Sequence, residues 1–145
     1  MSVPTEVPGG AGAATDPRSR DPELQGRTYA IPFERVWTGA LQLAAGGLPR
    51  WRVLKADDQR GVILAVSTST IRKHASDVRI TVGLDADGQT RVDLSAEARD
   101  GRGRLRHDRK SITTFLRHLD RVIEAREGLI LAPRAELQGA PGSLA

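Results

Sequence analysis

The residues best suited to chemistry form a basic segment that runs from Arg99 to Lys110. It contains six Lys or Arg residues against two Asp residues, so its net charge of +4 equals the formal charge of the whole chain. Such a concentration of cations can attract a phosphate backbone, an acidic protein or an anionic lipid surface. No Phe, Tyr or Trp is interleaved with it, so it offers no platform for stacking single-stranded bases. The alternative interpretation is a hydrated loop that only improves solubility.

A shorter basic stretch lies in the loop 70–76 between two expected strands. Alternate connections of an antiparallel meander lie at the same end of the sheet, so this loop and the segment after Arg99 should meet there. The sequence therefore predicts one contact surface for an anionic partner. Its residues are Arg72, Lys73, Arg99, Arg102, Arg104, Arg106, Arg109 and Lys110.

Catalytic patterns are scarce. The three histidines, His74, His107 and His118, lie neither at metal-binding spacing nor beside a serine elbow, and no Walker-type glycine loop is present. The chain has no cysteine, which excludes disulfides, thiolate metal sites and cysteine nucleophiles. These observations favour a protein that is not an enzyme, and they predict no catalytic residue, no metal and no cofactor.

A β-hairpin must position the basic segment. Apolar residues alternate with polar ones over 78–84 and again over 91–99, which is the period of a strand with one buried face. Asp85-Ala86-Asp87-Gly88 between the two runs supplies turn residues, and Gly88 can take a positive φ. A second hairpin is predicted upstream, with strands over 51–56 and 62–69 joined by residues 57–61.

Two helices are predicted beside these strands. The first starts after a short strand over 27–31, with Pro32 as its first residue, and Gly46-Gly47 with Pro49 end it. The second is predicted to take Asp108 as its N-cap and to end at Gly128. Both show an apolar stripe at helical spacing. The first stripe contains Phe33, Val36, Trp37, Ala40, Leu41 and Ala44, and the second Ile112, Phe115, Leu116, Leu119, Val122 and Ile123.

The order β-α-β-β-β-β-α predicts an α+β fold. It is a two-layer sandwich in which an antiparallel β-meander sheet carries both helices on one face. Small residues at Ala40, Ala44, Ala65, Ala96 and Ala98 either let the helices pack closely or leave room for an apolar ligand.

The C-terminal half of this pattern contains a series of residues in a characteristic order. They are Val92-Asp93-Leu94, Arg99, Gly101, Gly103, Leu105, Ile112, Phe115 and Leu116, with Asp77 at an acidic position before a strand. This series follows without a gap, and resembles, the signature of a bacterial, algal and plant family known as domain of unknown function 1499 (DUF 1499). The resemblance covers roughly Tyr29 to Val122 and implies a shared fold, but the family name carries no reaction to transfer.

The departures from the signature fall on its polar positions. Ser95, Ala96 and Ala98 stand where the signature has an arginine and two serines, and Arg104, Arg106, Asp108 and Ser111 replace Asp, Gly, Asn and Arg. We therefore expect this chain to have lost or rebuilt any polar site that the family shares.

Both ends of the chain have the composition of tails. Residues 1–26 are rich in Pro, Gly, Ala and Asp without an apolar run, so we expect them to be disordered and to be neither a signal peptide nor a membrane anchor. Residues 129–145 are expected to form a flexible C-terminal tail, which leaves 27–128 as one domain. Many members of the resembling family carry a membrane or export segment, so the lack of a transmembrane segment here favours a cytoplasmic protein.

These inferences converge on a small soluble binding or interaction module whose contact surface is the basic loop. The open alternative is a carrier of a small, lipid-like apolar ligand held between the helices and the sheet. A basic-loop binder should lose affinity steeply as salt rises, whereas a pocket carrier should show little salt dependence.

Overall fold

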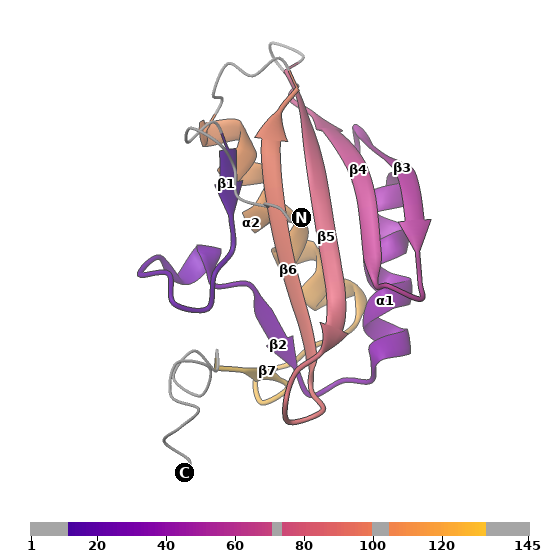
Figure 1. Ribbon diagram of the computed structural model, residues 1–145, viewed down its shortest axis with the longest axis vertical. Coiled ribbons are helices and arrows are strands. Elements are labelled where there is room, and N and C mark those ends of the chain that lie inside the picture. The colour runs from indigo at the N-terminus through magenta and orange to yellow at the C-terminus, as the bar shows by residue number, and fades with distance from the viewer. Residues whose placement is uncertain (1–11, 71–73, 100–104, 133–145) are drawn as a thin grey trace.

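The computed structural model describes residues 12–70, 74–99 and 105–132. It has one antiparallel sheet of seven strands with two α-helices behind it, which confirms the predicted α+β sandwich with a meander sheet (Figure 1). Part of the predicted contact surface, namely Arg72, Lys73, Arg102 and Arg104, lies outside the described residues.

The centre of the sheet is the predicted meander. Strands β3 (Trp51–Asp57), β4 (Val62–Thr68), β5 (Ala75–Leu84) and β6 (Thr90–Ala98) pair in sequence order. Alternation places one side of each strand in the core, as with Val78, Ile80 and Val82 of β5. The β3–β4 register shifts between Val53 and Lys55, so a bulge interrupts the exposed edge of the sheet.

The helices form the second layer and cover the same face of the sheet (Figure 1). Helix α1 spans Phe33–Gln42 and continues into a wider turn, Leu43–Gly47, which ends where Gly46 adopts a φ of 120°. Helix α2 spans Leu105–Val122. The predicted stripe of α2 is buried except for Val122, which is 42% exposed, so the assignment of Val122 to the core is wrong.

The boundaries of α2 differ from those predicted. The helix begins before Asp108, whose side chain is buried and accepts a hydrogen bond from Ser76 Oγ at 2.5 Å, so Asp108 is not the N-cap. It ends at Val122 and not at Gly128, because Glu124 adopts a φ of 55° and Arg35 Nη2 donates to the Ile123 carbonyl at 2.6 Å. Asp108 therefore bonds to Ser76 of the sheet instead of capping the helix. At the other end, the positive φ of Glu124 ends the helix before Gly128 is reached.

The structure describes the N-terminal segment from residue 12, and residues 12–26, which belong to the range predicted to be disordered, contain regular elements. Strand β1 (Gly12–Ala14) pairs with the C-terminal half of β6, and β2 (Arg27–Tyr29) pairs with the N-terminal half of the same edge. A short 3₁₀ helix, Pro22–Leu24, lies between them. Thr15 Oγ1 donates to Asp93 Oδ1 at 2.7 Å and accepts from the Leu94 amide at 3.1 Å. The edge of β6 supplies the partners that composition alone did not reveal.

Regular structure continues past residue 128, into the range where the sequence predicts a tail. Strand β7 (Ile130–Leu131) pairs with β2 through Tyr29 and Thr28, which extends the domain past residue 128. None of the described helices is both long enough and apolar enough to cross a membrane.

Candidate partner-binding surface

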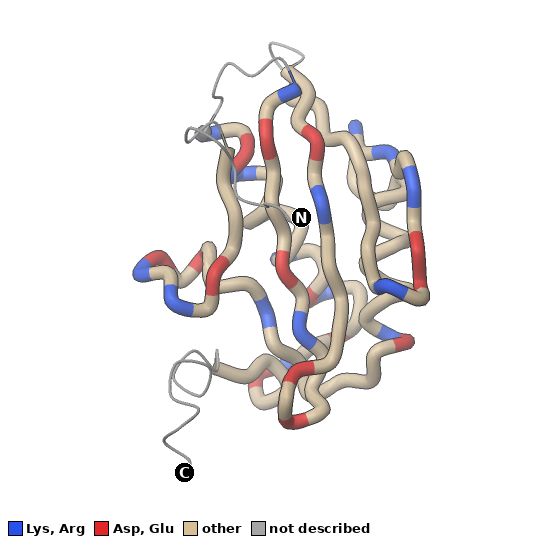
Figure 2. Tube along the Cα trace, viewed as in Figure 1, with Lys and Arg blue, Asp and Glu red and all other residues tan. Residues whose placement is uncertain are grey.

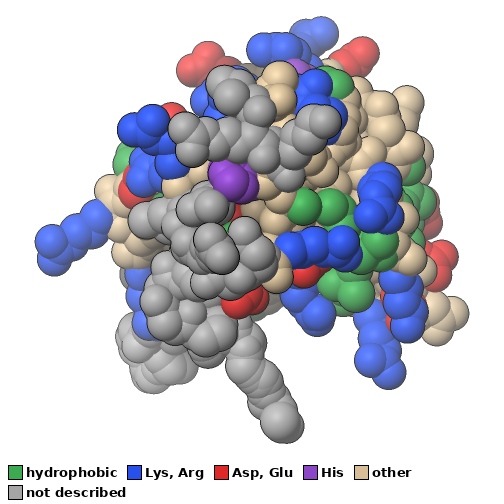
Figure 3. All heavy atoms as spheres, turned by 90° about the horizontal axis from the view of Figure 1, so that it is seen from above, with side chains coloured by type: hydrophobic (Ala, Val, Ile, Leu, Met, Phe, Trp, Pro, Cys, Tyr) green, Lys and Arg blue, Asp and Glu red, His purple; other side chains and the backbone are tan. Residues whose placement is uncertain are grey.

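One end of the sheet gathers the described members of the predicted contact surface. Ser76 of β5 lies opposite Ala98 of β6, and the Arg99 amide donates to the Ala75 carbonyl at 2.9 Å. The stretch before β5 and the segment after β6 therefore lie at the same end, which confirms the topological prediction. Figure 3 looks onto this end and shows basic side chains around an apolar area.

Three predicted cations are exposed here. Arg106 and Lys110 lie in the first turns of α2, and neither makes an ion pair with another described residue. Arg99 Nε contacts Asp77 Oδ1 at 2.9 Å, but both side chains are exposed. Exposed pairs contribute only about 0–1 kcal/mol, so Arg99 can exchange its partner at little cost.

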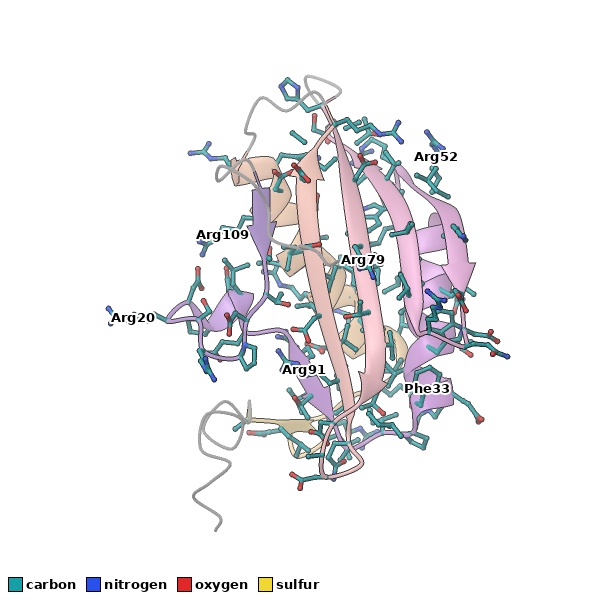
Figure 4. The ribbon with its side chains drawn as sticks, in the orientation of Figure 1. Arg20, Phe33, Arg52, Arg79, Arg91 and Arg109 are labelled. Carbon is teal, nitrogen blue, oxygen red and sulfur yellow. The ribbon has the colours of Figure 1, made fainter. Side chains whose placement is uncertain are left out.

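Arg109 differs from these three residues because it already has anionic partners within the chain. Its guanidinium contacts Asp21, and it also lies 3.7 Å from a carboxylate oxygen of Glu23. Both acids belong to the N-terminal segment, and Figure 4 shows Arg109 on the side of α2 that faces this segment. The structure thus places Arg109 near the predicted surface but engages it with the chain's own carboxylates.

Two further arginines at this end were missed by the sequence interpretation. Arg50 and Arg52 flank Trp51 at the start of β3, and the Thr68 amide donates to the Arg50 carbonyl at 3.0 Å. The meander rule that placed the other loops also places the start of β3 at this end. The prediction included only the connections that precede β5 and follow β6, whereas these two residues lie at the start of β3. Figure 2 shows basic residues along this part of β3.

A buried polar layer underlies the basic end. The Ser67 and Ser111 hydroxyl oxygens are 3.1 Å apart, and Ser76 donates to Asp108 as described above. All four side chains are buried, so these contacts satisfy polar groups that would otherwise be costly to desolvate. They tie α2 to β4 and β5, and they hold its first turn, with Arg106 and Lys110, against the sheet.

The described histidines contact separate partners rather than sharing a site. His107 Nε2 lies 3.4 Å from the Ser67 carbonyl, and His118 Nδ1 lies 2.9 Å from the Thr114 carbonyl. The amide of His74 donates to Ser69 Oγ at 3.0 Å. These contacts do not assemble a nucleophile, a base and an orienting acid.

The shifted pKa values belong to a cluster away from the basic end. Tyr29 Oη donates to Asp120 Oδ1 at 2.6 Å, and Arg27 Nη2 lies 3.0 Å from Asp120 Oδ2. Burial raises the pKa of Tyr29 strongly, and the hydrogen bond to Asp120 raises it further. For Arg27, burial lowers the pKa, but the hydrogen bond and the charge of Asp120 outweigh it, so the net pKa is raised. The cluster joins β2 to α2 and is structural.

Four of the small residues that were predicted either to let the helices pack closely or to leave room for an apolar ligand lie in the packed core. Ala40, Ala44, Ala65 and Ala96 are each at most 1% exposed and belong to one hydrophobic cluster with residues of both helices and the sheet. The carrier alternative stays a prediction, which native mass spectrometry for a retained apolar ligand can check.

Comparison of the chain with models of protein families, with curated proteins and with solved structures finds no match in any of the three.

Proposed function

We propose that this protein is a binding module that recognises an anionic partner through the basic end of its sheet. The observation that carries the proposal is the convergence of Arg99 with Arg106 and Lys110 at one end, where β5 begins and β6 ends. The fold thus holds three cations from one stretch of the sequence, 99–110, where a single partner can contact them together. These three residues form the basic end of the sheet.

Charge distribution supports this choice of surface. Elsewhere, partly buried arginines are neutralised within the fold, as Arg91 is by Asp93 at 2.8 Å and Arg27 is by Asp120. At the basic end the cations are exposed, and only Arg99 forms an ion pair with a residue that the structure describes. Such a field attracts anions and raises association rates. The predicted cations Arg72, Lys73, Arg102 and Arg104 would add to it.

The chemistry shared by the candidate partners is a dense array of negative charge. An acidic protein, a nucleic-acid backbone or an anionic lipid surface each offers it, and the absence of aromatic residues from 99–110 disfavours stacking on single-stranded bases. Binding rather than catalysis is proposed because the described histidines have separate contacts. A cytoplasmic location remains part of this proposal.

Membership of the DUF 1499 family is likewise proposed. Matched signature positions with described side chains include Val92, Leu94, Ile112, Phe115 and Leu116, and all five are buried. The apolar part of the resemblance therefore rests on residues that build the core, whereas the matched Asp77, Asp93 and Arg99 are not buried. It supports a common fold and leaves the partner to be found from the surface.

The test is fluorescence anisotropy with labelled heparin and with labelled duplex DNA, each at about 50 and about 200 mM salt. The variant R99Q/R106Q/K110Q should weaken binding and lower the salt slope by up to about 3, because each lost contact removes roughly one unit. The control K55Q/R79Q/R117Q removes three exposed cations elsewhere. R102Q/R104Q tests the predicted extension of the surface.

The arms of the experiment separate the sources of negative charge. Binding to heparin and DNA alike indicates recognition of charge density, and sedimentation with vesicles that contain anionic lipid tests the membrane arm. If R99Q/R106Q/K110Q and the control K55Q/R79Q/R117Q lose equal affinity for heparin and DNA, the proposed surface is overturned. Absence of salt-sensitive binding to heparin, DNA and vesicles would overturn recognition of phosphate or sulfate arrays and leave an acidic protein as the partner.

A further inference from the structure

A surface pocket lies at the corner where β3 begins and β4 ends. It has a volume of about 390 Å³ and is lined by Arg50, Trp51, Arg52, Thr68, Ser69 and Thr70. Figure 4 shows Arg52 beside the upper end of β3. The pocket shares no residue with the basic end as defined above, so it can be tested independently of the proposed function.

The charge of the pocket is positive. Arg50 and Arg52 are both exposed, and neither forms an ion pair within the described part of the chain. No Asp or Glu is among the residues that line the pocket. Two guanidinium groups with available donors suit a carboxylate, sulfonate or phosphate group, which they can bind in a bidentate manner.

The backbone at Arg50 adds a second observation. Its φ is 65°, in the left-handed region where glycine is favoured. Arg50 follows the stretch Gly46-Gly47-Leu48-Pro49, where two glycines are already present. Glycine would adopt the backbone conformation of position 50 more easily. Arginine at this position instead places a cation at the pocket. Strained positions of this kind are found at functional sites.

The other residues of the lining provide apolar surface and hydroxyl groups. Trp51 is 8% exposed and packs on Phe115 with ring centroids 5.3 Å apart, so the core fixes its position. Ser69 Oγ accepts from the His74 amide at 3.0 Å, which leaves its own proton available to donate. Thr68 and Thr70 add methyl and hydroxyl groups.

We propose that this pocket binds a small organic anion, with its charged group on Arg50 and Arg52 and its apolar body against Trp51 and the threonines. The volume lies within the range of about 300–1,000 Å³ that is typical of sites for small molecules. An inorganic ion would leave most of this space to water. An anion with an aromatic or branched apolar body fills it and uses both the charge and the apolar lining.

The experiment uses the intact chain with the change Trp37→Phe, which leaves Trp51 as the single tryptophan and keeps an aromatic ring beside Phe33. The probe is 1-anilinonaphthalene-8-sulfonate, an aromatic anion. Its titration should quench Trp51 by energy transfer and saturate at one probe per chain. N-Phenyl-1-naphthylamine, which lacks the sulfonate, should bind at least tenfold more weakly, and so should inorganic phosphate.

The decisive variant is R50N/R52Q in the same background. Asparagine tolerates the positive φ at position 50, so the change removes charge without adding strain. We expect at least a tenfold loss of affinity for the sulfonate. The matched control K55Q/R79Q also removes two exposed cations, from β3 and from the middle of β5, and should bind like the parent.

Three results would overturn the pocket: equal binding by both double variants, no saturable quenching of Trp51, or equal affinity for the neutral and the anionic probe. Urea unfolding of each variant checks that the probe reports the native state rather than a loosened core. Because Arg50 and Arg52 are unchanged in R99Q/R106Q/K110Q, that variant should retain the probe. Loss of heparin binding and loss of probe binding can therefore occur separately.

Discussion

Tyr29 of β2 donates a hydrogen bond to Asp120 of α2 at 2.6 Å, across 91 positions of sequence. The phenol is fully buried, and Arg27 binds the same carboxylate. Ionising this phenol would place a second negative charge beside Asp120 in the interior, so burial and the hydrogen bond raise the pKa of Tyr29 well above its ordinary value of 10.0.

We expect stability to fall with alkaline pH because of Tyr29. The unfolded phenol loses its proton near pH 10 and the folded phenol retains it, so the folded state binds more protons above that pH. The contribution of Tyr29 to the free energy of unfolding is complete below pH 10. Above pH 10 it falls by about 1.4 kcal/mol for each pH unit. The chain has one tyrosine, so absorbance at 295 nm follows Tyr29 alone. Titration near pH 10 in the folded protein would contradict this, and Y29F should lack this part of the pH dependence.

Changing Asp120 to Ala should destabilise the protein by about 2–4 kcal/mol. The change leaves the buried Tyr29 hydroxyl and the partly buried Arg27 guanidinium without their acceptor. Urea unfolding measures the effect. The control is Asp57→Ala, which removes an exposed pair with Arg60 and two exposed hydrogen bonds that Asp57 accepts from the amides of Gln59 and Arg60. A loss from D120A no larger than that from D57A would show that water replaces the carboxylate.

Changing Gly61 to Ala should be much more harmful than changing Gly88 to Ala. Both glycines have positive φ, 69° and 80°, so alanine pays a similar backbone cost at each. A Cβ on Gly61 would lie 2.0 Å from the Val82 carbonyl oxygen, whereas nothing lies within 4 Å of one on Gly88. We expect G88A to lower the free energy of unfolding by about 1 kcal/mol and G61A to lower it by at least about 2 kcal/mol more, as measured by urea unfolding. Similar losses would mean that the β3–β4 turn moves away from β5 without cost.

Removing the acids that hold Arg109 should strengthen binding of polyanions. D21N/E23Q frees the guanidinium beside the basic end, so heparin affinity and the salt slope should both rise, the slope by about 1. The pairs of Arg109 with Asp21 and Glu23 are partly exposed, so the free energy of unfolding should change by no more than about 1 kcal/mol. The control is D16N, which removes an acid from the same segment whose side chain accepts a hydrogen bond from the Arg18 amide. An equal rise with D16N would assign the effect to net charge, and adding R109Q to D21N/E23Q should reverse a specific gain.

The sequence predicted the meander and both helices because their patterns are local. Alternation over β5 and β6 and the turn at Gly88 encode a hairpin within about twenty residues, and each helix has its own apolar stripe. The same rules predicted that Arg99 would lie at the end of the sheet where β5 begins. These rules also place Arg106 and Lys110 near that end, because the connectivity of a meander determines which turns are neighbours.

Elements that depend on distant partners could not be predicted this way. The sequence Gly-Ala-Ala of β1 shows no alternation, and its strand exists because β6 offers an unpaired edge. Asp108 has a good N-cap residue type, but Ser76 on another strand provides its contact. Arg109 was assigned to the surface by composition, and the acids that engage it lie in a segment that was expected to be disordered. In each case the deciding partner lies more than thirty positions away.

The pairing of β6 with both β1 and β2 has a kinetic consequence. Strands β3 to β6 join neighbours through short turns, whereas Thr15 and Asp93 meet across 78 positions and Arg27 and Asp120 across 93. Closing long loops costs entropy that must be recovered from contacts formed afterwards. We therefore expect refolding to begin in the meander, and the amides of β1 to gain protection from hydrogen exchange last. In the native protein the same amides should be the first to open, so the N-terminal strand forms a separate unit of local unfolding.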